Sequence, residues 1–135
     1  MKGVTIQDRD PVNDVLSFDL VEVLQAIGDD IDCSLWTCHG VECAGGESAD
    51  VLHKACDDSQ VLVRAVLLQL ARGVTQVIDG EFIGRMPGED EPWVLIRAVD
   101  STAFDVGSTR DSVLDLARAR FASVADRSES SGARC

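Results

Sequence analysis

Four short apolar segments follow one another between residues 75 and 106, and turn residues separate them. The first two flank Asp79 and Gly80 in the stretch TQVIDGEFIG, a pattern typical of a two-residue β-hairpin turn. The third, WVLIRAV at 93–99, alternates between two faces as a strand does. The fourth lies within DSTAFDV at 100–106. Consecutive short strands joined by tight turns predict an antiparallel sheet.

Helical spacing of apolar residues appears on both sides of this region, in segments 17–27, 47–56, 59–73 and 108–121. The segment CSLWTCHGVEC at 33–43 alternates like a further strand. The resulting order is α-β-α-α-β-β-β-β-α. It lacks the strand–helix–strand alternation and glycine-rich phosphate turn of a doubly wound nucleotide fold. The sequence therefore predicts an α+β fold, with a mostly antiparallel sheet of about four to five strands and helices packed on one of its faces.

Domain organisation follows from where this periodicity begins and ends. Residues 1–12 are polar and are expected to form a loose N-terminal arm, and residues 124–135 a polar C-terminal tail. Residues 13–123 are expected to form a single α+β domain. A chain of 135 residues with 45% hydrophobic content is large enough to bury a core without a metal or disulfides.

Negative charge is the strongest bulk property of the chain. The formal net charge is −12, and residues 1–60 hold 13 acidic residues against three basic ones. Such a field repels nucleic-acid phosphates and anionic lipids and attracts basic partners, so we expect no nucleic-acid or membrane partner. The alternative is that the acidic residues only keep the protein soluble. With no secretory signal at its start and an odd count of five cysteines, the chain is expected to be cytoplasmic, with free thiols.

Three cysteines and a histidine lie within residues 33–43, followed by His53 and Cys56, which raises the question of a zinc site, a catalytic thiol or a disulfide. In one extended strand Cys33 and Cys43 would lie about 33 Å apart, and Cys38 would point to the opposite face from Cys33. Acidic neighbours would also disfavour a thiolate. We therefore expect no metal, no cofactor and no catalytic residue here, only cysteines that fill small buried positions.

The function that this chemistry favours is binding rather than catalysis. A small, acidic, cytoplasmic domain suits a module that neutralises a basic protein, as bacterial immunity proteins and antitoxins do, a likeness of physical type alone. Trp36, Trp93 and Phe82, if exposed, would be the aromatic anchors of the interface. The residues expected to contact the partner are Asp19, Glu22, Asp29, Asp30, Asp32, Trp36, Asp57 and Asp58.

The alternative is a small-ligand-binding protein or an enzyme, with a pocket between the sheet and the helix at 60–73. A deep pocket lined by polar groups would favour this alternative, and a filled core with an acidic face would favour the binding module. A homodimer joined through an exposed strand edge is compatible with both hypotheses.

Overall fold

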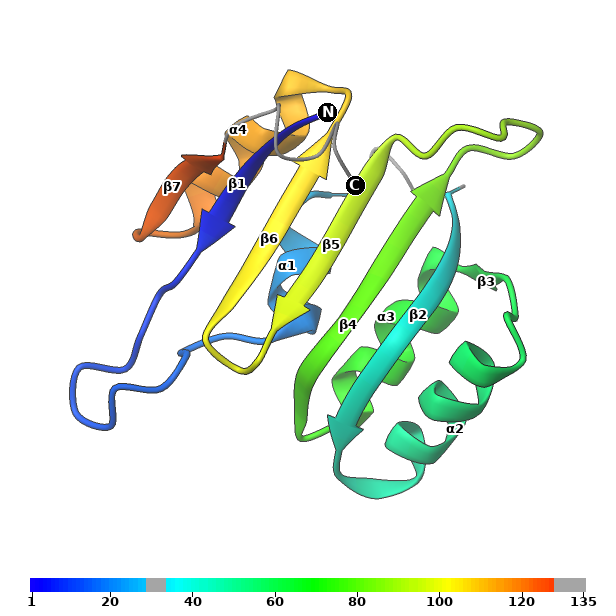
Figure 1. Ribbon diagram of the computed structural model, residues 1–135. Helices are drawn as coiled ribbons and strands as arrows, with labels where there is room; N and C mark the ends of the chain where they lie inside the picture. Colours follow the sequence, from blue (N-terminus) through cyan, green and yellow to red (C-terminus); the bar gives the residue numbers. More distant parts are fainter. Residues whose placement is uncertain (29–33, 128–135) are drawn as a thin grey trace.

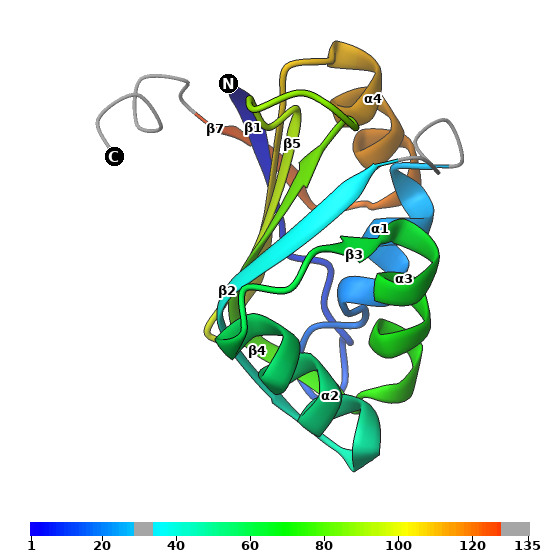
Figure 2. The same cartoon turned by 90° about the vertical axis from the view of Figure 1, so that its right-hand side faces the viewer.

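The strands of the described part of the chain pair in one antiparallel sheet, with the helices against one side of it (Figures 1 and 2). The computed structural model describes residues 1–28 and 34–127. Within those residues the sheet has seven strands in the order β3-β2-β4-β5-β6-β1-β7. The strands are β1 (Lys2–Ile6), β2 (Leu35–Ala44), β3 (Leu62–Val63), β4 (Gln76–Arg85), β5 (Val94–Val99), β6 (Ala103–Ser108) and β7 (Val124–Arg127). The helices are α1 (Leu20–Ala26), α2 (Gly46–Asp57), α3 (Arg64–Gly73) and α4 (Asp111–Arg120).

The α+β class and the antiparallel sheet are confirmed, but the predicted strand count and element order are wrong. Two of the additional strands come from segments expected to be an arm and a tail. Residues 2–6 form β1, which pairs with β6 on one side and with β7, residues 124–127, on the other. Val4 and Ile6 of β1 are completely buried. The arm and tail predictions failed at these residues because β1 obtains its partners from the far end of the chain, which local periodicity does not reveal.

The predicted hairpin at Asp79 and Gly80 is also wrong, since β4 continues through both residues and pairs with β2 and β5. Gly80 has a φ of 146°, and a Cβ there would lie 3.0–3.4 Å from Val41 of β2. The Asp79 carboxylate instead accepts the backbone N–H of Asp100, at 2.8 Å. The tight turn lies at that point, where Asp100 and Ser101 adopt positive φ between β5 and β6.

Three helices begin later than the sequence suggests, among them the one expected from Ser108, which begins at Asp111. The helix expected from Ser17 begins at Leu20, because Asp19 rather than Ser17 caps it. The helix expected from residue 59 begins at Arg64, because Leu62–Val63 pairs with the start of β2 as the edge strand β3. No helix among residues 1–28 and 34–127 is long and apolar enough to cross a membrane.

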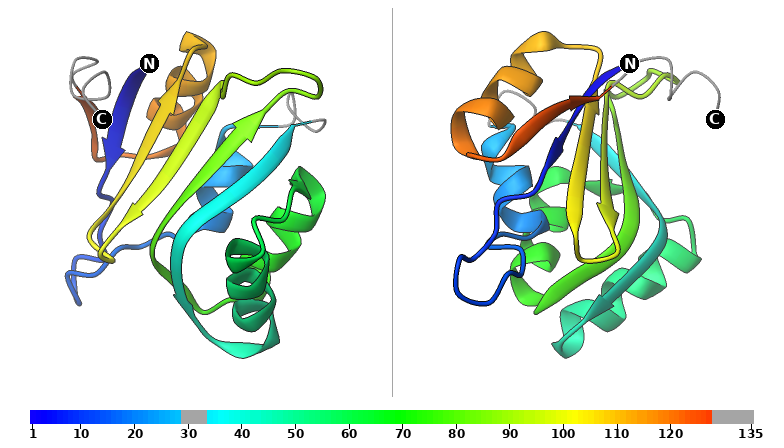
Figure 3. Two further views of the ribbon diagram at one scale, coloured as in Figure 1. Left: turned by 45° about the vertical axis from the view of Figure 1, so that its right-hand side comes forward. Right: turned by 60° about the vertical axis from the view of Figure 1, so that its left-hand side comes forward.

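The core lies between the sheet and the helical layer, which Figure 2 shows edge-on and Figure 3 from two further sides. Its largest fully buried side chains include Trp36 of β2, Phe82 of β4 and Phe104 of β6. Gly84 of β4 allows the Trp36 ring to lie close to the sheet, since a Cβ at Gly84 would lie 3.2 Å from that ring and 2.5 Å from Val94 Cγ1. Packing is therefore tight at the centre of the sheet.

Gly84→Ala should destabilise the protein by about 1–3 kcal/mol, because the added methyl group overpacks this site. Urea denaturation would measure the change in the free energy of unfolding. Val94→Ala removes the nearest obstructing atom, so Gly84→Ala should cost less in the Val94→Ala background than in the wild type. An equal loss of stability from Gly84→Ala in the wild type and in the Val94→Ala variant would contradict this packing.

Candidate functional site

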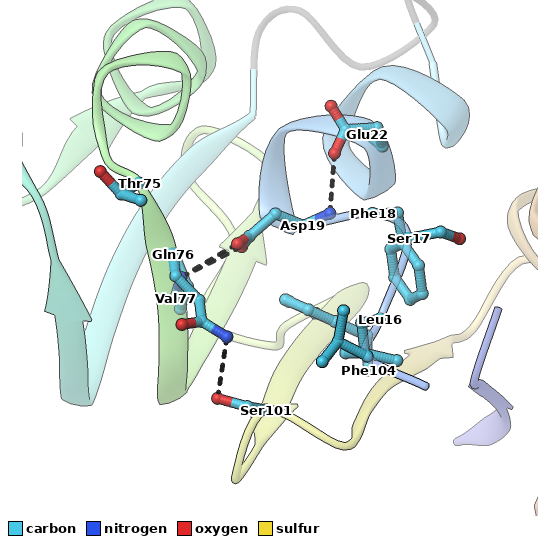
Figure 4. Close-up of a pocket in the computed structure, with 11 residues that line it drawn as sticks. Leu16, Ser17, Phe18, Asp19, Glu22, Thr75, Gln76, Val77, Ser101 and Phe104 are labelled. Atoms are coloured by element: carbon cyan, nitrogen blue, oxygen red, sulfur yellow. Dashed lines mark hydrogen bonds between the residues drawn. The ribbon is translucent and has the colours of Figure 1, made fainter. Parts of the chain in front are cut away.

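A cavity of about 450 Å³ opens where the segment before α1, the start of β4 and the β5–β6 turn meet (Figure 4). Its volume falls within the range of small-molecule sites, roughly 300–1,000 Å³. None of its lining residues lies in the 60–73 segment, so this cavity is not at the position predicted for a pocket. It is lined by Val15, Leu16, Ser17, Phe18, Asp19, Glu22, Thr75, Gln76, Val77, Ser101 and Phe104.

Asp19 forms one wall of the cavity and joins α1 to the sheet. The backbone N–H of Leu20 donates to its carboxylate at 2.7 Å, which caps the helix. The N–H of Val77, at the start of β4, donates to both carboxylate oxygens at 3.2 Å each. One side chain thus fixes the distance between a helix and a strand that are far apart in the sequence.

Glu22 completes a capping box with Asp19, whose backbone N–H donates to Glu22 Oε1 at 2.7 Å. Neither carboxylate forms an ion pair with any residue in the described ranges, and none of the side chains lining the cavity is Lys, Arg or His. Two negative charges therefore share the cavity without a cation from its own lining.

Burial raises the pKa of Asp19 above its usual value of 3.8, and the nearby negative charge of Glu22 raises it further. The hydrogen bonds from Leu20 and Val77 oppose this shift only in part. The charged form of Asp19 is thus held at a free-energy cost that a cation in the cavity would lower.

The rest of the cavity is divided between apolar and hydrogen-bonding groups. Phe18, Val77 and Phe104 are buried, and Leu16 is partly buried beside them. Figure 4 shows the Gln76 side chain directed at Ser101, and Gln76 Nε2 donates to Ser101 Oγ at 3.1 Å. The cavity could therefore hold a ligand with a hydrocarbon part and a positively charged, hydrogen-bond-donating end.

The aromatic anchors predicted for a partner interface are not available. Trp36 and Phe82 are completely buried and Trp93 is 5% exposed, so all three belong to the core. Trp36 was therefore wrongly included among the contact residues, because β2 places it on the face that packs against the helices. The predicted contacts Asp29, Asp30 and Asp32 lie outside the described residues.

The remaining predicted acidic residues fall into two groups on different helices. Asp19 and Glu22 lie at the start of α1 beside the cavity, whereas Asp57 and Asp58 are exposed at the end of α2. Helix α3 lies between α1 and α2 and packs against both (Figure 1). The single acidic face expected from the sequence is thus divided.

Helix α2 also exposes acidic residues that were not singled out. Glu47 and Asp50 lie three residues apart and are exposed, as are Asp57 and Asp58 seven residues further along. These spacings place all four on the same outward side, two near the start of the helix and two at its end. We call Glu47, Asp50, Asp57 and Asp58 the acidic face of α2. The helical spacing of the four acids was the signal in the sequence that could have grouped them.

The cysteines do not lie as strict strand alternation predicts. Register shifts interrupt β2 between His39 and Cys43, next to Gly40, which has a φ of 60°. Cys38 and Cys43 are five residues apart, yet both are buried as a result. A glycine inside a strand is a known sign of such a bulge and could have signalled this change.

The bulge brings Cys43 against His53 of α2, which sequence reasoning missed. Cys43 Sγ lies 3.6 Å from His53 Nε2, and the backbone N–H of Cys43 donates to the same nitrogen at 3.2 Å. Nε2 is therefore an acceptor here. Among residues 1–28 and 34–127, no three His, Cys, Asp or Glu side chains are arranged to hold a metal ion.

The environment of these thiols disfavours nucleophilic chemistry. Burial raises the pKa of Cys43, and the charges of Asp19 and Asp50 raise it further. Burial also raises the pKa of Cys38 to about 12. Since the thiolate is the reactive species, both groups are held in their unreactive form at neutral pH.

Comparisons with known proteins add no family or function. Searches against protein-family models, curated proteins and solved structures found no match.

The raised pKa of Asp19 predicts a pH dependence of stability. The folded state retains the Asp19 proton to higher pH than the unfolded state. The contribution of Asp19 to the free energy of unfolding therefore falls as the pH rises from 3.8 through the raised pKa of the folded state. Asp19→Asn keeps a capping oxygen but does not titrate. The free energy of unfolding of wild type minus that of Asp19→Asn, measured in urea, should therefore decrease between pH 3 and pH 7. An increase would contradict the assigned environment.

Cys38 should react far more slowly than Cys56 with iodoacetamide at pH 8. With a pKa of about 12, only about one Cys38 thiol in ten thousand is ionised at that pH, whereas Cys56 is partly exposed. Mass spectrometry of peptides from a Cys33→Ser/Cys135→Ser variant would follow each site over time. Equal alkylation rates at the two cysteines would show that Cys38 is not buried as described.

Proposed function

We propose that the protein is a binding module for a basic protein partner, which it neutralises as an immunity protein or antitoxin does. The observation that carries this proposal is the acidic face of α2. Its four carboxylates point away from the core, and Lys54 is the basic residue among them. Lys54 pairs with Asp58 at 3.3 Å, which leaves the face with a net negative charge.

Glu47 lies in the first turn of α2 and favours the helix dipole, but the stability of the helix does not account for Asp57 and Asp58. A helix C-terminus carries partial negative charge, so acidic residues there are unfavourable. Asp57 is the last residue of α2 and Asp58 is its C-cap. Asp57 forms no ion pair with a residue of the described part of the chain. Carboxylates that oppose the helix dipole support a role in binding.

The position of α2 also supports a docking role. The helix lies at one end of the molecule, beside the edge of the sheet formed by β2 and β3 (Figures 1 and 2). Val51, on the same outward side as Asp50 and Lys54, is 51% exposed and adds an apolar contact to the charged ones. A negative surface of this kind raises the association rate of a basic partner and gives specificity.

The experiment compares two variants that each remove three negative charges. Asp50→Asn/Asp57→Asn/Asp58→Asn changes the acidic face of α2, and Glu89→Gln/Asp90→Asn/Glu91→Gln changes the exposed β4–β5 loop. Tagged wild type should capture a basic protein from its native host, and the purified partner is then titrated against all three proteins. The α2 variant should bind at least tenfold more weakly and the loop variant within about twofold of wild type. Rising salt should weaken wild-type binding.

Equal weakening in both triple variants would mean that only net charge matters and would contradict a docking role for α2. Capture of no basic protein, or binding that is unchanged by the α2 substitutions, would contradict the proposal as well.

A further inference from the structure

We propose that the cavity beside α1 binds an aliphatic cation, an alkylammonium or guanidinium group carried on a flexible hydrocarbon stem. Such a group has two sources, a Lys or Arg side chain of a protein partner and a free small amine. In the first case the inference rests on the function proposed above and names its subsite; in the second it stands independently. The chemistry that the cavity recognises is the same in both.

The charge of the cavity selects a cation. Its two ionisable lining groups are Asp19 and Glu22, which are adjacent in the capping box. Both carboxylates accept hydrogen bonds from backbone N–H groups. No basic side chain of the cavity lining neutralises either of them. Because an anion would meet two carboxylates, and a neutral ligand would leave their repulsion unchanged, a cation fits best.

The uncharged polar groups of the cavity can act as hydrogen-bond acceptors. Gln76 donates an amide N–H to Ser101, and no hydrogen bond within the described residues uses Gln76 Oε1. Ser17 and Thr75 also line the cavity, although Figure 4 shows their hydroxyl groups directed away from Asp19. Ammonium and guanidinium groups are donors only, with three and five N–H groups respectively, so they match the carboxylates of Asp19 and Glu22 and the amide oxygen of Gln76.

The apolar part of the cavity selects a hydrocarbon stem. Figure 4 shows the Asp19 carboxylate and the side chains of Leu16 and Phe104 around the same space. Val77 adds a further buried apolar group beside Asp19. A bare inorganic cation would gain nothing from these surfaces, whereas an alkyl chain would bury methylene groups against them. Each buried methylene contributes about a fourfold gain in affinity.

The test is a titration of the isotope-labelled protein, followed by NMR, with methylammonium, n-butylammonium, agmatine and butyrate as probes. We expect saturable shifts of the Thr75, Gln76, Val77 and Ser101 amides with n-butylammonium and agmatine. Methylammonium should bind at least tenfold more weakly than n-butylammonium, and butyrate should not bind. Equal affinity for the two amines, binding of butyrate, or no saturable shift would overturn the proposal.

Two double variants locate the charge that matters. Asp19→Asn/Glu22→Gln removes the cavity charges while keeping residues that can form the capping box, and should weaken n-butylammonium binding at least tenfold. Asp57→Asn/Asp58→Asn removes the same charge from α2 and should leave that binding unchanged. Equal loss in both variants, or no loss in the first, would overturn the proposal.

A measurement on the wild type avoids any dependence on variant folding. The Asp19 carboxyl carbon can be titrated with and without saturating n-butylammonium. The bound cation should lower the pKa of Asp19, and butyrate should not. An unchanged Asp19 pKa at saturation would mean that the amine does not lie beside this carboxylate.

The same variants identify the source of the cation and keep the two proposals separate. If Asp19→Asn/Glu22→Gln also weakens binding of the captured partner, the cation is a side chain of that partner. If partner binding is unchanged while n-butylammonium binding is lost, the ligand is a free amine. If the α2 substitutions leave the affinity for the partner unchanged, the proposed function is contradicted. The binding of n-butylammonium to the cavity would still stand.

Discussion

The Asp19 carboxylate joins the helical layer to the sheet, and much of the surrounding structure depends on it. It caps α1 and accepts the backbone N–H of Val77 at the start of β4. Val77 pairs in turn with Cys43 of β2, beyond the bulge that brings Cys43 to His53. A single partly buried charge thus fixes a helix, positions a strand end and forms one wall of the cavity.

The sequence predicts the fold well where the evidence is local. The alternation in residues 93–99 identifies β5, and helical spacing locates the four helices to within several residues. The misses arise from contacts between distant segments. Strand β1 is held by β6 and β7. Asp79 and Gly80 lie in a bulged central strand rather than in a turn, because β2 and β5 pair with β4 on its two sides.

The candidate site is harder to predict from the sequence than the fold. Asp19 and Glu22 were expected to face a partner, and the structure shows that they form the capping box at the start of α1. Gln76 and Ser101 carry no motif, and only the sheet register brings them to the same cavity. Trp36 was misassigned because alternation identifies a strand without showing which of its faces is covered.

We propose that carboxylates contact cations at two places, the acidic face of α2 and the cavity beside α1. The most direct test is hydrogen–deuterium exchange of the protein with and without its captured basic partner. We expect the partner to slow exchange in α2 and around its exposed end at Asp57 and Asp58. Protection confined to the uncovered face of the sheet, with α2 unchanged, would contradict it.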